Sequence, residues 1–452
     1  MRRRSVHAGL WGWLMSAGAV LAEQRFPPPE FDSGYQLPLT QVPVPRALLF
    51  PYLDVLVLAI ALALASYLVY RRRSRRGVWV LSIFSLIYFG FYRKGCICAI
   101  GAPQNIALGL FDSSYAVPLT VAAFFLLPLL FSLFAGRTFC AAVCPHGALQ
   151  DLVLLKPVPV PAWLEEGLSV VPYVYLGAGI LFAATGSAFL ICRYDPFVPL
   201  FRMTGSFTML MLGAGFLVAG MFVGRPYCRF LCPYGALLRL ASLAAKWRVR
   251  VTPDYCTQCR LCEESCPFGA LREPAPTLAN PQALVPERRR LGWLLGLLPV
   301  LIGAGAWIGS HFALPASRLH PTVALAEQYL DPAKPPPPRL PTPDSLALGR
   351  ADQDPVRLVK EAAGIRRRFV TAGWLFGGWI GLVIGVKLLA LSVRPSRTDY
   401  EPDRGACVAC ARCFTYCPNE RVRLGLLPRS AIPLPPSPVP GLPAPAPDRG
   451  PA

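Results

Sequence analysis

Charged residues are scarce in this 452-residue sequence: only 15% are Asp, Glu, Lys or Arg, whereas 54% are hydrophobic. A soluble chain of this length would need more polar surface, which argues against one large globular core. Histidine occurs only four times, and no two histidines suit a haem held between facing helices. No glycine-rich nucleotide fingerprint follows a strand-like segment, and no motif for covalent flavin attachment is present. We therefore expect no haem and no built-in flavin or NAD site.

What is abundant is apolar sequence in long blocks, which is typical of membrane spans. Seven such stretches lie at about 48–70, 77–92, 116–135, 168–190, 206–224, 291–313 and 370–391. The pattern predicts an all-α polytopic protein with about seven transmembrane helices, multi-pass in an inner (plasma) membrane. The formal net charge of +20 comes from basic clusters beside apolar runs. It indicates the positive-inside bias rather than a nucleic-acid partner.

Basic clusters orient the predicted spans. Placing Arg71–Arg76 and Arg288–Arg290 inside puts the C-terminus on the cytoplasmic side. Two clusters disagree, because Arg93-Lys94 and Arg366–Arg368 then fall outside. We keep this topology because it places all twelve motif cysteines on one face, with the three other cysteines on the opposite face.

Fifteen cysteines carry most of the functional information. Eight lie in two runs of the spacing C-x2-C-x2-C-x3-C-P, Cys256 to Cys266 and Cys407 to Cys417. In bacterial two-cluster ferredoxins, the last cysteine of each run ligates the other cluster. We therefore expect two 4Fe–4S clusters, held by set A (Cys256, Cys259, Cys262 and Cys417) and by set B (Cys407, Cys410, Cys413 and Cys266). The alternatives are two independent clusters, each bound by its own run, or zinc, which usually shows paired C-x2-C knuckles.

Four further cysteines form two C-x3-C-P pairs, here called set C (Cys140, Cys144, Cys228 and Cys232). Each pair repeats the second half of a ferredoxin run. The segments Cys144-Pro-His-Gly-Ala-Leu, Cys232-Pro-Tyr-Gly-Ala-Leu and Cys266-Pro-Phe-Gly-Ala-Leu are versions of one sequence. Four thiolates suffice for a third 4Fe–4S cluster. The open alternative is that the pairs bind no cofactor and act as redox-active or structural thiols.

Cys96, Cys98 and Cys192 remain, all on the predicted outer face. They could form an outer-face redox or metal site, where a transmembrane electron route would need a stop. Against this, three thiolates are few for a closed site, and free buried cysteine is common. Asp54 lies within the first predicted span, where acidic residues are often functional; a helix-end acid near the interface is the alternative.

The predicted organisation follows from these motifs. Its segments are a signal peptide or uncleaved anchor (1–22), an extracytoplasmic Pro-rich linker (23–46), a five-span bundle with the two C-x3-C-P motifs (47–245), a first ferredoxin half (246–285), a transmembrane hairpin (286–395) with an extracytoplasmic loop (314–365), a second ferredoxin half (396–425) and a disordered Pro-rich tail (426–452). If the two halves cross-ligate, the last two spans must lie side by side as a hairpin.

The two C-x3-C-P pairs, the Cys-Arg-Tyr-Asp-Pro-Phe segment at 192–197 and the two ferredoxin runs resemble the NapH/NosR-type family of membrane ferredoxin proteins. The resemblance implies an electron-transfer component, such as a quinol dehydrogenase subunit, between the quinone pool or a cytoplasmic donor and an extracytoplasmic redox partner. Two features depart from it. NosR-like proteins carry a large outer flavin-binding domain, for which 23–46 is too short, and the family usually keeps the ferredoxin halves adjacent.

The resemblance therefore favours a relative that works with a separate flavoprotein. A second hypothesis is an assembly or maturation factor, whose clusters reduce a metal for an extracytoplasmic oxidase or reductase. A copper-selective Met/Cys pair on the outer loops would favour it, but the chain has only six methionines.

Overall fold

The structure is a computed structural model, and it describes residues 49–95, 99–252, 256–275, 281–330, 355–393, 397 and 399–432. The predicted signal segment and linker, Cys96 and Cys98, most of the predicted outer loop after residue 330, and the tail after residue 432 lie outside the described residues. All described residues belong to one unit of the chain, which begins at Leu49.

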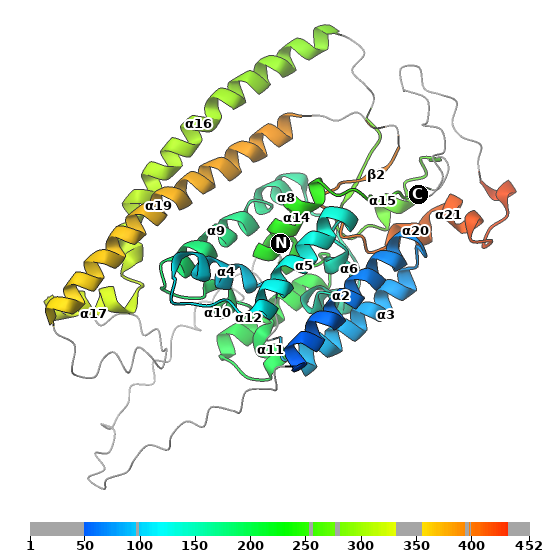
Figure 1. Cartoon of the computed structure of the whole chain (residues 1–452). Helices are drawn as coiled ribbons and strands as arrows, with labels where there is room; N and C mark the ends of the chain where they lie inside the picture. The colour runs from blue at the N-terminus through cyan, green and yellow to red at the C-terminus, as the bar shows by residue number, and fades with distance from the viewer. Residues whose placement is uncertain are drawn as a thin grey trace, which may run out of the picture. The chain divides into compact units, whose positions relative to one another are not determined.

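Helices dominate the described residues (Figure 1). The bundle contains α2 (Leu49–Tyr70), α3 (Arg75–Ser85), the π-helical η1 (Leu86–Tyr92), α4 (Ala102–Phe111), α5 (Leu119–Ala135), α6 (Thr138–Ala142), α7 (Pro145–Val153), α8 (Ala162–Leu168), α9 (Val171–Ala184), α10 (Leu190–Arg193), α11 (Val198–Arg202), α12 (Phe207–Gly220), α13 (Pro226–Phe230) and α14 (Pro233–Leu243). The remaining elements are α15 (Leu261–Glu264), β1 (Leu271–Arg272), α16 (Pro281–Ser317), α17 (Pro321–Leu330), α19 (Pro355–Ser392), β2 (Glu401–Pro402), α20 (Arg412–Tyr416), α21 (Pro418–Arg423) and the 3-10 turn η2 (Arg429–Ala431).

Each of the seven predicted apolar stretches falls on a helix. Four helical segments are long and apolar enough to cross a membrane: Leu49–Tyr70, Ala162–Ala184, Arg289–Ser317 and Val356–Ser392. Two other stretches coincide with the shorter apolar helices α5 and α12. The last, at 77–92, is α3 continued by η1.

Helix α2 illustrates why these segments become membrane helices. It buries a stripe at helical spacing, formed by Leu58, Ala61, Leu62, Ala65 and Val69. That stripe packs against α3, α5 and α6. Its opposite face exposes further large apolar side chains, such as Leu56, Ile60 and Leu64. A helix apolar on every side suits a hydrocarbon environment.

Helices α16 and α19 lie side by side along a seam of glycines (Figure 1). A Cβ atom placed on Gly377 would lie 2.8 Å from the carbonyl carbon of Gly305 and 2.9 Å from the Cα atom of Gly309. Small residues at such a seam let two membrane helices approach backbone to backbone. Helix α19 also contacts α9, where the Trp379 indole donates a hydrogen bond to the Tyr173 carbonyl at 2.9 Å.

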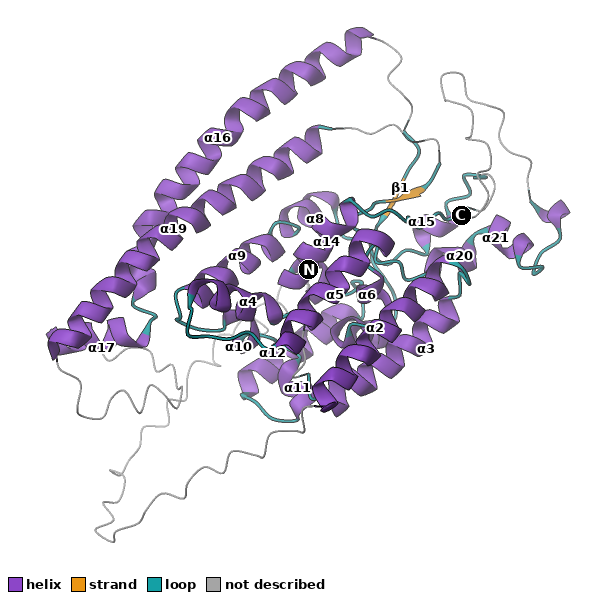
Figure 2. Ribbon diagram, viewed as in Figure 1, coloured by secondary structure: helices purple, strands orange, loops and turns teal. Residues whose placement is uncertain are grey.

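A two-stranded antiparallel sheet joins the chain segments on either side of this hairpin (Figure 2). Strand β1 pairs with β2 in the register Leu271 to Pro402 and Arg272 to Glu401. A further bridge joins Ala275 and Arg397. The segments expected to form the two ferredoxin halves therefore meet, although a long stretch of sequence separates them.

Arg73, in the turn between α2 and α3, connects both of these halves to the helical bundle. Its guanidinium donates to the carbonyls of Arg250 at 3.0 Å and Val251 at 2.7 Å. It also pairs with the buried Glu420 carboxylate at 3.0 Å and lies 3.9 Å from the centre of the Phe414 ring. A single cation thus fixes both halves beneath the bundle.

Candidate metal centre

The two ferredoxin runs adopt one backbone conformation. In the first run, Gln258 and Arg260 have positive φ angles of 54° and 61°. At the equivalent positions of the second run, Ala409 and Ala411 have φ angles of 55° and 60°. A short helix follows in each, α15 or α20. The left-handed conformation costs roughly 1–2 kcal/mol for a residue with a side chain, so its recurrence at matched positions points to a functional loop.

Set A draws on both runs. Burial raises the pKa of the Cys262 thiol to about 12, and the neighbouring thiols of Cys256, Cys259 and Cys417 act in the same direction. Burial also raises the pKa of Cys417, where Cys259 and Cys256 are again neighbours. The last cysteine of the second run therefore lies beside the first three cysteines of the first run. Cys259 is exposed, whereas Cys262 and Cys417 are buried.

Set B is arranged in the reciprocal way. Burial raises the pKa of Cys413, and the thiols of Cys407, Cys410 and Cys266 act in the same direction. Burial raises the pKa of Cys407 to about 12, with Cys410 and Cys266 again among its neighbours. Cys262 of set A also acts on Cys413, so sets A and B adjoin.

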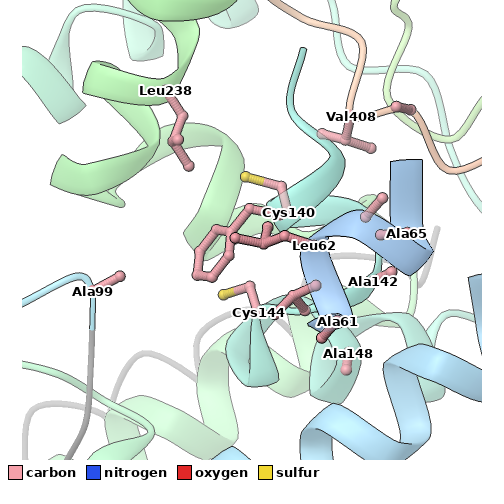
Figure 3. Close-up of a cluster of buried hydrophobic side chains, with 14 of the residues drawn as sticks. Ala61, Leu62, Ala65, Ala99, Cys140, Ala142, Cys144, Ala148, Leu238 and Val408 are labelled. Carbon is pink, nitrogen blue, oxygen red and sulfur yellow. The ribbon is translucent and has the colours of Figure 1, made fainter. Parts of the chain in front are cut away.

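Set C comes together from two helix–turn–helix segments of the bundle, α6–α7 and α13–α14. Cys144 and Cys232 occupy equivalent places, each just before the proline that begins α7 or α14. Figure 3 shows the sulfur atoms of Cys140 and Cys144 pointing to the same side of their segment. Burial raises the pKa of Cys232, and Cys228, Cys144 and Cys140 act in the same direction.

Hydrogen-bond donors are directed at the sulfurs of set C. The Gln150 amide donates to the Cys228 sulfur at 3.1 Å, and the Gly235 backbone N–H donates to the Cys232 sulfur at 3.3 Å. The Arg137 guanidinium lies 3.8 Å from the Cys140 sulfur. Donors of this kind stabilise a sulfur that carries negative charge, as a ligating thiolate does.

The donor set fits iron–sulfur clusters. Each set supplies four sulfurs, and burial disfavours a thiolate unless a strong positive charge lies beside it. An iron–sulfur core provides that charge. Among the described residues, no three of His, Cys, Asp and Glu are grouped in a way that could hold a single metal ion.

Comparisons with known proteins support the binding of iron–sulfur clusters. Residues 117–159 and 205–251, which contain set C, match a family described as a 4Fe-4S binding domain, and residues 249–272 match a second family of the same description. The protein NirI of Paracoccus denitrificans is 34% identical over 152 residues, covering 31% of this chain and 22% of NirI. YccM of Escherichia coli, an electron transport protein by name, is 29% identical over 180 residues, covering 36% of this chain and 49% of YccM.

The regulatory protein NosR of Pseudomonas aeruginosa is 28% identical over 219 residues, covering 44% of this chain and 30% of NosR. This chain is a relative of the NapH/NosR-type membrane ferredoxin proteins. The chain spans about a fifth of the length of NirI and half of the length of YccM. No solved structure is significantly similar to it. With its apolar helices and these relatives, it is a membrane protein with 4Fe–4S binding domains.

Three polar residues contact the site without belonging to the predicted ligand sets. His146 follows Cys144-Pro145, and its Nε2 atom lies 3.0 Å from the Asp195 carboxylate. Asp195 also accepts from the backbone N–H groups of Phe197 and Val198. It therefore ties the Cys-Arg-Tyr-Asp-Pro segment to set C. One signal was available, because His146 stands where the other two copies of the segment have Tyr and Phe.

The third is Gln150, whose side chain is fully buried. Besides the Cys228 sulfur, it contacts the His146 carbonyl at 2.9 Å and accepts from the Tyr227 N–H at 3.1 Å. It therefore holds α7 against α13. The same kind of signal was available, because the corresponding positions of the repeated segment carry Leu238 and Arg272.

The structure describes only Cys192 of the predicted outer-face site. Cys192 is exposed and lies against Gly101, whose added Cβ atom would be 2.6 Å from the Cys192 sulfur. Cys96 and Cys98 lie outside the described residues. The site therefore stays a prediction.

Proposed function

We propose that this protein is an iron–sulfur electron carrier of the inner membrane. It would relay electrons between the quinone pool or a cytoplasmic donor and an extracytoplasmic redox partner. The observation that supports this most strongly is the grouping of twelve cysteines, from four separate chain segments, into sets A, B and C. The electron transport name of the relative YccM points the same way.

In this proposal, set A and set B each hold one 4Fe–4S cluster by cross-ligation, and set C holds a third. The clusters supply reversible one-electron chemistry when bound. The protein supplies what surrounds them. Hydrogen-bond donors to the set C sulfurs favour the more negative, reduced state of the cluster. Burial of these cysteines excludes water from the site.

Exposure suggests where electrons enter and leave. Set A contains the exposed Cys259, so a soluble partner could approach it. Three of the four set C cysteines are buried, in a bundle whose helices are apolar on their outer faces. We assign exchange with a soluble partner to set A and exchange with a membrane or outer partner to set C. Set B, which adjoins set A, would connect them.

The proposed orientation has the C-terminus and the clusters on the cytoplasmic side. Two basic clusters in the sequence run against this orientation, and one arginine of each takes part in an ion pair. Arg93 pairs with the buried Asp54 at 2.7 Å, and Arg366 pairs with Glu327 at 2.5 Å. Asp54 then has a structural role, as the partner of Arg93 and of the Tyr88 hydroxyl.

The test is anaerobic purification of the full chain, with iron and labile sulfide assays and an EPR redox titration. Three clusters predict about twelve iron atoms per chain, whereas about eight would reject the third cluster. The dithionite-reduced protein is then mixed with the short quinone menadione while its visible absorbance is followed. Reoxidation without loss of iron supports the relay. Colourless protein that contains zinc and no labile sulfide would reject the function altogether.

The assembly-factor hypothesis makes a different prediction. Its clusters should donate electrons to a metal ion, which the same reduced protein can test with aqueous Cu²⁺ in place of menadione. Reoxidation by Cu²⁺ alone would favour that hypothesis, whereas reoxidation by menadione supports the relay.

A further inference from the structure

Two arginines are almost fully buried beside set C, Arg137 at 7% exposure and Arg225 at 2%. A carboxylate compensates the charge of Arg225, because its Nε and Nη2 atoms donate to Asp151 at 2.8 and 2.7 Å. Arg137 is different. Within the described part of the chain it has no ion-pair partner, and its Nε atom has no hydrogen-bond acceptor.

The contacts of Arg137 point in two directions. Its Nη2 atom lies 3.8 Å from the sulfur of Cys140, which belongs to set C. Its Nη1 atom donates at 3.0 Å to the carbonyl of Gly405, two residues before Cys407 of set B. Arg137 also lines a cavity together with Cys140, Cys228 and Cys232. The guanidinium therefore stands between set C and the start of the second ferredoxin run.

A buried guanidinium without a carboxylate is costly unless another anion compensates it. A 4Fe–4S core with four thiolates is anionic in both of its working redox states and gains one more negative charge on reduction. Arg137 is then compensated by the clusters, and it is compensated best when they are reduced. A neighbouring positive charge and a donor to sulfur both raise a cluster's reduction potential.

We propose that Arg137 is a positioning residue that raises the reduction potential of the set C cluster and couples this cluster electrostatically to the set B cluster. This inference rests on the proposed function. The step it favours is one-electron transfer, in which the reduced set B cluster loses one electron and the oxidised set C cluster gains it. No bond forms or breaks, and no proton takes part. The larger effect falls on set C, because Arg137 contacts a sulfur there and only a backbone carbonyl near set B.

The test compares R137Q and R137K with the wild-type full chain, each purified anaerobically and assayed for iron and for potentials by EPR titration. R248Q is the matched control, because it removes the same charge from an exposed position. We expect R137Q to keep its iron and to lower the equilibrium constant for reduction of one cluster about tenfold, or about 59 mV for one electron. R137K keeps the charge and should recover at least half of that shift, whereas R248Q should show none.

The outcomes separate this inference from the proposed function. Wild-type protein with about eight iron atoms would reject the third cluster, and this inference with it. About twelve iron atoms with unchanged potentials in R137Q would overturn the role of Arg137 alone. If R137Q loses iron, the iron content and the potential of R137K are the deciding measurements. An R137K protein that retains its cluster with a near wild-type potential supports the proposal. Loss of the cluster from R137K as well would make Arg137 purely structural and overturn it.

Discussion

Cross-ligation between the two ferredoxin runs makes a prediction that pairs of substitutions can test. If Cys266 ligates the set B cluster, then C266A and C410A damage the same cluster, whereas C266A and C259A damage different ones. Each complete chain should hold about twelve iron atoms in three clusters, so each single variant should hold about eight. The double variant C266A/C410A should also hold about eight, whereas C266A/C259A should hold about four.

The structure sets these expectations, because Cys266 is among the neighbours of Cys407 and Cys413, and Cys417 is among those of Cys262. The assay is iron and labile sulfide per chain after anaerobic purification, with the spin count of reduced samples as an independent measure. C192A is the control, since the exposed Cys192 belongs to none of the three sets and should cost no iron. Ligation of each cluster by its own run gives the reverse pattern, with about four iron atoms in C266A/C410A and about eight in C266A/C259A. That result would refute the reasoning.

Three further substitutions test the frame around the clusters. E420Q removes a fully buried carboxylate that pairs with two arginines. The ferredoxin halves should be destabilised by about 3 kcal/mol and should lose iron faster to a chelator. G377A should destabilise the hairpin by about 1–3 kcal/mol, measured by thermal unfolding in detergent. G378A is the control and should be neutral, because its added Cβ atom would lie 3.7 Å from the nearest neighbouring atom. D195A leaves the buried His146 without its hydrogen-bond partner and should lower the unfolding free energy by about 1–3 kcal/mol, with D195N losing less. Equal stability of D195A and wild type would contradict this.

Sequence spacing predicts much of this arrangement because thiolate ligands obey strict rules. The repeated run of four cysteines and a proline is enough to group Cys417 with the first run and Cys266 with the second. The same argument requires the last two spans to meet, and α16 and α19 do lie side by side. The glycines of the seam are visible in the sequence, but their register against each other is not.

What spacing could not predict are contacts between residues far apart in the chain. Asp195 and His146 meet only after α7 and the loop before α11 have packed. Arg137 is one arginine among many in a strongly basic sequence, and its contact with Gly405 depends on how the second ferredoxin run packs on the bundle. Local patterns carry no information on such pairs. The helix count was also hard to read, because α5 and α12 are shorter than the apolar stretches that predict them.

The split between the two ferredoxin halves has a consequence for assembly. Under cross-ligation, neither set A nor set B is complete until residues on both sides of the hairpin have met. The β1–β2 pairing joins the segments that flank this hairpin, in which α16 packs against α19. An iron–sulfur module with adjacent halves could instead close without this hairpin. Under cross-ligation, completion of sets A and B therefore goes together with the packing of α16 against α19.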